Sequence, residues 1–406
     1  MASARGLGKA AFMDANRQVP DGSDRGGGRR HRWRAVAAAA VIAAGVAALA
    51  PATPAGASAR PYTVFATGLD NPRHLAIGRF GGVYVAESGS GGDTCVTAVD
   101  PETGEPAEMC AGPTGALTRI SQSGASRRVV TGLPSLAGPD GSEALGPVDV
   151  SVAEGLHILI SGANAVEPPA LAGLLAGAGT LVRRIEGTDS VRTVADVSAY
   201  EASNNPDGGE VDSNAYGLYT SRTGEHYVTD AGGNSLLALT RAGAISTVAT
   251  FAGGTTPAPP FLGAPPGTQV PYQAVPTGVD VGPDGRPYVG QLTGFPFPRD
   301  KAKVFRVGRF GAVSGYAFGF TNVVDIDWGP DGSLYVVELA AQGLLTDTGG
   351  PPVGSLYRIH PDGTRELLSG SELVLPGGVV AGGDGAVYVS INSTSAGAGQ
   401  VLRYAP

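Results

Sequence analysis

Short apolar stretches recur along this chain, and each follows a turn that contains glycine. In six of them apolar and polar positions alternate around a Tyr-Val pair or its equivalent. The six segments are 81–88 (GGVYVAES), 155–162 (GLHILISG), 224–231 (GEHYVTDA), 285–292 (GRPYVGQL), 332–339 (GSLYVVEL) and 385–392 (GAVYVSIN). Alternation with a period of two predicts half-buried β-strands. Their recurrence predicts one structural unit that is repeated six times.

Each unit extends to four predicted strands. An earlier strand precedes each segment, and a later one follows it with the form GSLYRI, in which an Arg slot is filled in five of six units. We expect these arginines to pair across neighbouring units. A fourth strand follows in five units, whereas the sixth unit ends at Pro406 without one. The missing strand is found at the other end of the chain, as YTVFATGL at 62–69.

This arrangement predicts an all-β, six-bladed β-propeller whose ring is closed by the N-terminal strand 62–69, which completes the last blade. Residues 60–406 would form a single domain. A pair of β-sandwiches explains neither the sixfold recurrence nor the isolated first strand. Gly-Pro-Asp-Gly at 282–285 and 329–332 lies between first and second strands, as a hairpin turn should.

Composition agrees with a folded protein that is rich in turns. The 406 residues include 64 Gly and 31 Pro, but only 16% are charged and 42% are apolar, which excludes a disordered chain. The glycines do not follow a G-X-Y period, which excludes collagen.

Residues 1–59 differ from the rest of the chain. Arg29, Arg30, Arg32 and Arg34 precede an apolar run at 35–50, and Ala57-Ser58-Ala59 follows as an A-x-A cleavage signal. This layout is typical of a secretory signal peptide. The alternative is a transmembrane anchor, although the run is short and mostly alanine. We therefore expect a secreted protein with no stable membrane span once the segment is removed.

Export changes what the charge and the cysteines imply. The first 59 residues hold 8 of 28 basic and 3 of 36 acidic residues, which leaves residues 60–406 with a net charge of about −13. Such a chain would be repelled by phosphate backbones, so we expect no nucleic-acid partner. Cys95 and Cys110 are the only cysteines, and we expect them to form a disulfide bond outside the cell.

Several stretches resemble the ScyD/ScyE family of secreted propellers and, more generally, NHL-type and gluconolactonase-like propellers. They include 68–78 (GLDNPRHLAIG), 110–120 (CAGPTGALTRI), 195–219 (ADVSAYEASNNPDGGEVDSNAYGLY), 275–298 (VPTGVDVGPDGRPYVGQLTGFPFP) and 375–390 (LPGGVVAGGDGAVYVS). The resemblance implies an exported bacterial propeller. It carries no catalytic residues over to this chain.

Candidate chemistry gathers on one face of the predicted ring. The long connections, at 89–114, 163–178, 198–214, 252–274, 293–301 and 339–353, all leave from the same face, where function usually lies. Strand ends on that face bring together acidic residues and one histidine. These candidates are Glu87, Asp149, Asp230 and Glu338, with His74 and Asp325 nearby. Glycines in the equivalent slots of other blades would leave room around the channel mouth.

Converging carboxylates repel one another and need a cation, a proton or a substrate. Hard oxygen ligands suit Ca²⁺, and the resemblance to gluconolactonase-like propellers implies such a metal near the channel. The alternative is a structural ring of acids that accept backbone N–H groups.

Two functional hypotheses follow. The first is a secreted, monomeric binding or scaffold propeller that holds a small molecule, glycan or protein on the long-loop face. The second is a Ca²⁺-dependent, lactonase-like hydrolase, or an accessory factor in an extracytoplasmic biosynthetic pathway. No G-x-S-x-G elbow, H-E-x-x-H motif or P-loop marks a reaction.

Overall fold

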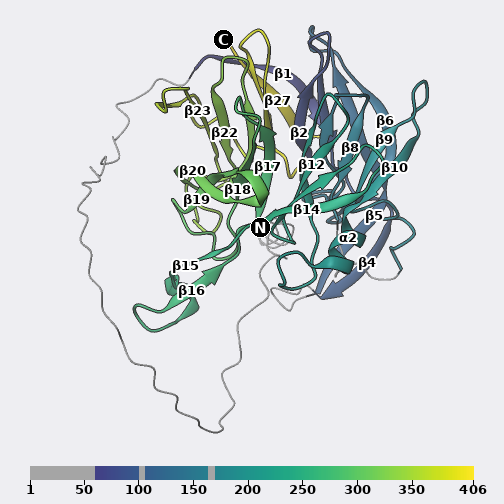
Figure 1. The fold of residues 1–406 in the computed structure, drawn as a ribbon. Helices are drawn as coiled ribbons and strands as arrows, with labels where there is room; N and C mark the ends of the chain where they lie inside the picture. The colour runs from purple at the N-terminus through teal and green to yellow at the C-terminus, as the bar shows by residue number, and fades with distance from the viewer. Residues whose placement is uncertain (1–59, 100–105, 163–169) are drawn as a thin grey trace.

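A computed structural model describes residues 60–99, 106–162 and 170–406. The predicted signal peptide, 1–59, lies outside the described residues. Six sheets of at least four antiparallel strands each are arranged around one axis, so the fold is the predicted all-β, six-bladed propeller (Figure 1). Among the described residues, no helix has the length and apolarity needed to cross a membrane.

The blades follow the repeats of the sequence, counted from the channel outwards. Blade 1 is β2 (Pro72–Ile77), β3 (Val83–Glu87), β5 (Pro106–Ile120) and β6 (Ser126–Ala137). Blade 2 is β7 (Pro147–Ser151), β8 (His157–Ile160), β9 (Thr180–Arg184) and β10 (Val191–Asp196). Blade 3 is β11 (Ala215–Thr220), β12 (His226–Asp230), β13 (Ser235–Leu239) and β14 (Ile245–Thr250). Blade 4 is β17 (Pro276–Val281), β18 (Pro287–Gln291), β19 (Ala302–Val307) and β20 (Val313–Phe320).

The remaining two blades close the ring. Blade 5 is β21 (Val323–Trp328), β22 (Leu334–Glu338), β23 (Ser355–Ile359) and β24 (Arg365–Leu367). Blade 6 is β25 (Gly378–Ala381), β26 (Val387–Ile391), β27 (Gly399–Tyr404) and β1 (Tyr62–Leu69). Strand β1 pairs antiparallel with β27, with Tyr62 opposite Tyr404. The N-terminal strand therefore completes the last blade, as predicted.

The innermost strands form a continuous ring around the axis. Strands β2, β7, β11, β17, β21 and β25 each contact the next one, and β25 contacts β2. The apolar side chains of successive blades pack face to face between the sheets, as Val148, Leu159 and Leu218 do. These six strands present one backbone edge each to the channel.

Three of the five arginines of the third strands form ion pairs within their own blade rather than across blades, which corrects our expectation for these three. Arg306 and Asp284 lie 2.6 Å apart, and Arg358 and Arg403 form ion pairs with acids in the equivalent turns of blades 5 and 6. The pairing is local because the Gly-Pro-Asp-Gly turn, which joins the first two strands, lies beside the third strand of the same sheet.

The long connections carry structure that periodicity did not predict. Strand β4 (Thr94–Val99) extends blade 1, where Cys95 lies opposite Cys110 and forms the predicted disulfide. Helix α2 (Val197–Asn204) links blades 2 and 3. Strands β15 (Gly254–Pro257) and β16 (Gln269–Tyr272), with the short helix η1 (Pro260–Leu262), form an arm between blades 3 and 4. A second short helix, η2 (Arg309–Gly311), lies between β19 and β20.

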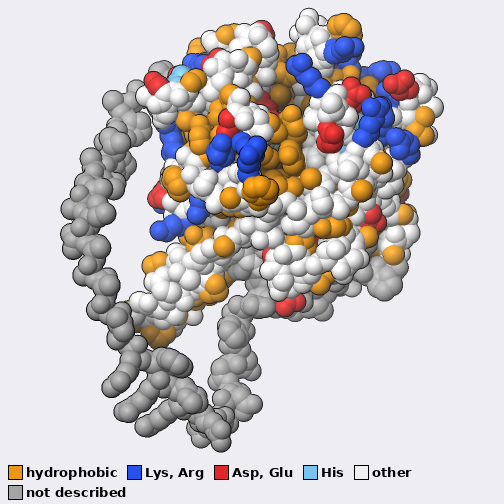
Figure 2. Space-filling view, in the orientation of Figure 1, with side chains coloured by type: hydrophobic (Ala, Val, Ile, Leu, Met, Phe, Trp, Pro, Cys, Tyr) orange, Lys and Arg blue, Asp and Glu red, His pale blue; other side chains and the backbone are white. Residues whose placement is uncertain are grey.

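The arm projects from the body of the propeller (Figure 1). No residue from 254 to 272 is charged, and its surface is accordingly white and orange in Figure 2. On the face drawn there, basic and acidic side chains lie interspersed.

Candidate functional site

Two of the predicted acids cap the edges of the innermost strands. Asp149 Oδ2 accepts the N–H of Leu218 in the next blade at 2.6 Å, and Oδ1 accepts the N–H of Val150. Asp325 does the same with the N–H of Val379, at 2.8 Å, in the blade that follows it. Edge N–H groups need partners when water is excluded. These carboxylates supply them and join one blade to the next.

His74 lies between these two aspartates. Its Nδ1 is 3.0 Å from Asp149 Oδ2 and 3.8 Å from Asp325 Oδ1. Burial opposes a charge on His74, but Asp325 and Asp149 outweigh it and raise the pKa to about 9. Burial also raises the pKa of Asp325, to about 7. The three groups therefore form one buried cluster, in which Asp149 lies within hydrogen-bond distance of His74 and Asp325 lies farther away.

The glycines in the slot equivalent to His74 have a different role from the one we expected. A Cβ on Gly278 would lie 2.2 Å from Asp325 Oδ1, and one on Gly378 would lie 2.7 Å from the His74 Cα. These glycines let neighbouring innermost strands approach closely, instead of leaving room at the channel mouth. A side chain there would push adjacent blades apart.

Glu87 is held by an ion pair on the outer side of its own blade. It is 1% exposed, and it receives hydrogen bonds from Arg128 Nε at 3.1 Å and Nη2 at 2.9 Å. Its Oε2 also accepts the N–H of Asp70, in the chain that leads into β2. Both oxygens of Glu87 are thus occupied by donors within blade 1.

Asp230 and Glu338 occupy the same strand position in blades 3 and 5. Asp230 Oδ1 accepts the N–H of Asn214 at 2.7 Å, and Glu338 Oε1 accepts the N–H of Thr321 at 2.7 Å. Burial raises the pKa of Asp230, and it raises that of Glu338 to about 7. Each acid fastens the segment that precedes its own first strand.

The structure therefore brings together three of the six candidates, His74, Asp149 and Asp325. The other three, Glu87, Asp230 and Glu338, each bond within their own blade. Within the described parts of the chain, no three His, Cys, Asp or Glu residues are grouped as the ligands of a metal ion would be. A Ca²⁺ ion at the channel stays a prediction.

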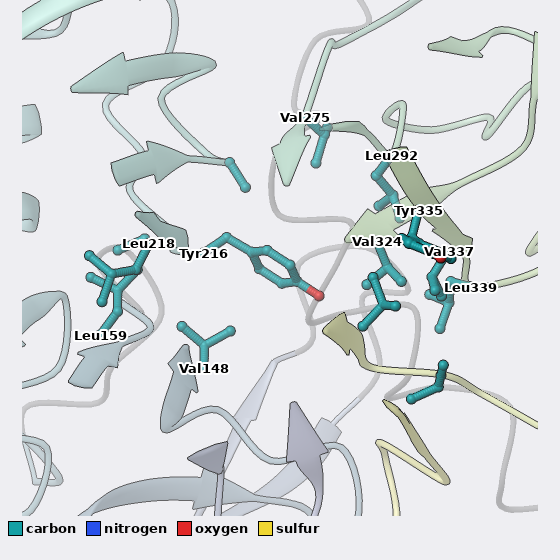
Figure 3. Packing of buried hydrophobic residues seen from close by; sticks show 14 of the residues in the cluster. Val148, Leu159, Tyr216, Leu218, Val275, Leu292, Val324, Tyr335, Val337 and Leu339 are labelled. Carbon is teal, nitrogen blue, oxygen red and sulfur yellow. The ribbon is translucent and has the colours of Figure 1, made fainter. Parts of the chain in front are cut away.

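A small pocket opens next to this cluster, at the strand ends on the long-loop side of blades 1, 2 and 3. Its lining residues are Arg73, Ser88, Ala144, Leu145, Val148, Ser161, Asn214 and Tyr216. Figure 3 shows the Tyr216 side chain extending from β11 into the space that the strands enclose, with its hydroxyl group leading. The pocket volume is about 10 Å³, which is room for one water molecule or one small polar group.

Arg73 is the charged group of this pocket. It is 5% exposed, and it donates from Nε to Ser88 Oγ at 3.2 Å and from Nη2 to the Ala144 carbonyl at 2.8 Å. No carboxylate of the described residues lies within ion-pair distance of it. Burial lowers the pKa of Arg73, while Tyr216 and Glu143 act in the opposite direction.

Glu143 is the nearest acid to influence Arg73. Its backbone has a positive φ of 57°, and its Oε2 is buried without a hydrogen-bond donor. Burial raises the pKa of Glu143 to about 7, and Arg73 lowers it only in part. Burial therefore disfavours the charged form of this carboxyl group, which is the form that would compensate the arginine.

Sequence patterns did not single out Glu143, Asn214 or Tyr216. Their position in the repeat could have indicated Tyr216, because Arg73 and Tyr216 occupy equivalent places in β2 and β11. Each directly precedes the position that His74 holds in β2. The apolar segment after residue 169 packs against one wall of the pocket. Its Leu171 and Leu175 are buried in one cluster with Leu136, and Leu145 of the pocket packs against that cluster.

Comparison with known proteins supports the fold and nothing narrower. No family model matches the chain, and no curated protein matches it. Among solved structures, a glucose dehydrogenase is 14% identical, with 85% of this chain and 99% of that chain covered and a TM-score of 0.50. The PQQ-bound aldose sugar dehydrogenase of Streptomyces coelicolor is 15% identical, with 87% and 99% covered and a TM-score of 0.49. Virginiamycin B lyase from Staphylococcus aureus is 12% identical, with 82% and 94% covered and a TM-score of 0.43.

These neighbours are six-bladed β-propellers. With a TM-score of 0.50, the likeness to the glucose dehydrogenase supports the fold of this chain and leaves its chemistry to be argued from its own residues. The narrower resemblance to the ScyD/ScyE family stays a prediction.

Proposed function

We propose that this chain is an exported, monomeric binding propeller that holds a small hydroxy acid on its long-loop face, with the ligand carboxylate on Arg73. The observation that carries the proposal is a buried arginine with no ion-pair partner among the described residues, at the mouth of the channel. An exported protein would meet such a ligand outside the cytoplasm.

A buried charge without a counter-charge is costly, by several kcal/mol in a protein interior. Arg73 uses two of its five N–H donors for Ser88 and Ala144. The remaining donors and the positive charge favour an anion, and a carboxylate matches the planar guanidinium with two parallel hydrogen bonds.

The rest of the pocket favours hydroxyl groups on the ligand. Asn214 and Tyr216 supply an amide and a hydroxyl to the lining, whereas the hydroxyls of Ser88 and Ser161 already donate to backbone carbonyls and could only accept from the ligand. Because the pocket has room for about one water-sized group, one carboxylate oxygen would enter it and the remainder of the ligand would lie across the loops. Sugar acids have this combination of one carboxylate and several hydroxyls.

Export is the second part of the proposal. It is supported by the signal-like segment at 1–59 and by the disulfide between Cys95 and Cys110, a bond that persists in oxidising compartments.

A Ca²⁺-dependent, lactonase-like hydrolase is the second candidate, and an accessory role in an extracytoplasmic biosynthetic pathway would use the same binding site. The cluster of His74 with Asp149 favours hydrolysis, because His74 Nε2 is buried without a hydrogen-bond partner. Because the pKa of His74 is raised to about 9, this histidine carries a proton near neutral pH and would suit a general acid. His74 is not among the residues that line the pocket.

Gluconate and glucose separate these possibilities, since both carry several hydroxyls but only gluconate carries a carboxylate. We expect gluconate to raise the melting temperature of the protein and glucose to leave it unchanged. Arg73→Met should abolish the effect, whereas Arg73→Lys should retain part of it. The second candidate is tested by an assay of glucono-lactone hydrolysis, in which proton release is measured with and without Ca²⁺. A response to neither compound would refute the hydroxy-acid site.

A further inference from the structure

The connection between blades 2 and 3 encloses buried acids that no pattern in the sequence explained. It consists of helix α2 and residues 205–214, and it packs against the turn 231–234 between β12 and β13. Asp230, Asp207 and Asp212 all lie close enough to Glu201 to raise the pKa of its carboxyl group, although Asp207 is exposed and Asp212 is half-buried.

Glu201 is the most unusual of these acids. It is 1% exposed, and its Oε1 is buried without a hydrogen-bond donor. Asp230 is 0% exposed, and its Oδ1 is taken by the backbone N–H groups of Asn214 and Gly233. Its Oδ2 is buried with no donor in hydrogen-bond geometry, although the Ser213 hydroxyl lies beside it.

The two neighbouring glycines of the turn show that the acids converge. A Cβ added to Gly233 would lie 2.6 Å from Glu201 Oε2, and one added to Gly232 would lie 2.8 Å from Asp212 Oδ2. Asp230 accepts the N–H of the same Gly233 at 3.1 Å. The turn therefore leaves a cradle of carboxylate oxygens that any side chain at these positions would fill.

Two amide oxygens complete the oxygen-rich surroundings. Asn205 Oδ1 and Asn214 Oδ1 are both buried without a donor. Asn205 follows α2, and its N–H bonds to the Glu201 carbonyl, while the N–H of Asn214 bonds to Asp230. The two asparagines thus belong to the segment whose backbone contacts Glu201 and Asp230, and the side-chain nitrogen of Asn205 donates to the Gly209 carbonyl.

Among the described residues, no basic side chain forms an ion pair with Glu201 or Asp230. Residues 196–234 contain one basic residue, Arg222, which lies at the opposite end of β11 in the turn before β12. Asp207 accepts a hydrogen bond from the neutral amide of Asn234. Buried carboxylates that lack a cationic partner need either a proton or a metal ion.

We propose that this connection is a binding site for a divalent cation of the Ca²⁺ type, held by the free oxygens of Glu201, Asp230, Asn205 and Asn214. Carboxylates and amide oxygens without nitrogen or sulfur ligands suit a hard cation. The carboxylates alone do not form the site, since no three of them meet as metal ligands. The amide oxygens supply the further donors.

The site has a structural consequence on the long-loop face. A cation would fasten residues 205–214 to blade 3, and Asn214 also lines the pocket beside Arg73. The proposal stands without the proposed hydroxy-acid ligand, because it rests on the surroundings of Glu201 and Asp230.

The test is calorimetric titration of CaCl₂ into the full chain after treatment with chelator, together with thermal melts in Ca²⁺ and in EDTA. We expect saturable binding and a melting temperature several degrees higher in Ca²⁺. Glu201→Gln should weaken Ca²⁺ binding by at least about tenfold. Glu186→Gln is the matched control, since it removes the same charge from an exposed turn, and it should bind Ca²⁺ as the unchanged protein does.

Three results would overturn the proposal. The first is the absence of both binding heat and a melting shift in the unchanged protein. The second is equal Ca²⁺ affinity of Glu201→Gln and Glu186→Gln. The third is a melting temperature that does not change with Ca²⁺ but rises on mild acidification in the unchanged protein and not in Glu201→Gln. That result would show that a proton, and not a metal ion, neutralises the cluster.

Discussion

The two buried histidines between blades 2 and 3 predict a specific dependence of stability on pH. His157 begins β8 and His226 begins β12, and their rings meet edge to face with centroids 4.7 Å apart. They are 4% and 2% exposed, and His226 Nδ1 lies 2.9 Å from Thr220 Oγ1. Burial lowers the pKa of each histidine to about 4.

The direction of the change in stability with pH depends on whether the folded or the unfolded chain binds more protons. An unfolded histidine titrates near 6.5, so between pH 6.5 and pH 4 the unfolded chain binds more protons than the folded one. Stability is therefore full above pH 6.5 and falls as the pH is lowered towards 4. For one histidine with a folded pKa of about 4, the loss at pH 5 is about 2 kcal/mol. The total free energy of unfolding of a native protein is only about 5–15 kcal/mol.

Buried acids with raised pKa values, such as Asp325 and Glu338, titrate with the opposite sign, so the test compares two proteins rather than two pH values. His157→Phe keeps a ring and removes one titration. Urea unfolding at pH 8 and pH 5 should show that the variant loses about 2 kcal/mol less than the unchanged protein. Parallel losses, equal within about 0.5 kcal/mol, would show that His157 is not held neutral by its surroundings.

Two further predictions concern the ring and its ion pairs. Deletion of 62–69 should leave β27 as an exposed edge and cause aggregation and a lower melting temperature; a truncated protein that melts unchanged in light scattering and circular dichroism would refute closure by β1. Arg128→Met should cost about 1–3 kcal/mol, because the buried Glu87 loses its cationic partner but keeps the Thr118 and Asp70 donors. Arg306→Met, which breaks the half-exposed pair with Asp284, should cost under about 1 kcal/mol in the same urea titration, and equal costs would contradict this difference in burial.

The blades could be predicted because each repeat reports its own local structure. Tyr84, Tyr227, Tyr288, Tyr335 and Tyr388 mark second strands whose alternation reflects burial between neighbouring sheets. The closing strand could be predicted by counting strands. The sixth unit had only three predicted strands, and the strand at 62–69 belonged to no other unit. Helix α2 and the arm of β15 and β16 were not predicted, because they occur once and no repeat supports them.

The candidate site was harder to predict because its contacts cross between blades. Repeat alignment located Asp149 and Asp325 at channel strand ends, but it could not show that their partners are N–H groups of the next blade. Arg73 and Glu143 come together only through the turn before β7, where Glu143 adopts a positive φ. Periodicity carries no information about such a turn.

The central claim is that Arg73 receives a carboxylate at the mouth of the channel. Its most direct test is calorimetric titration of gluconate, with glucose as the matched neutral sugar, into the full chain and into Arg73→Met. We predict saturable binding of gluconate alone, weakened by at least about tenfold in Arg73→Met, which corresponds to a loss of about 1.4 kcal/mol or more. Equal gluconate affinities of the two proteins, or equal binding of gluconate and glucose, would contradict the claim.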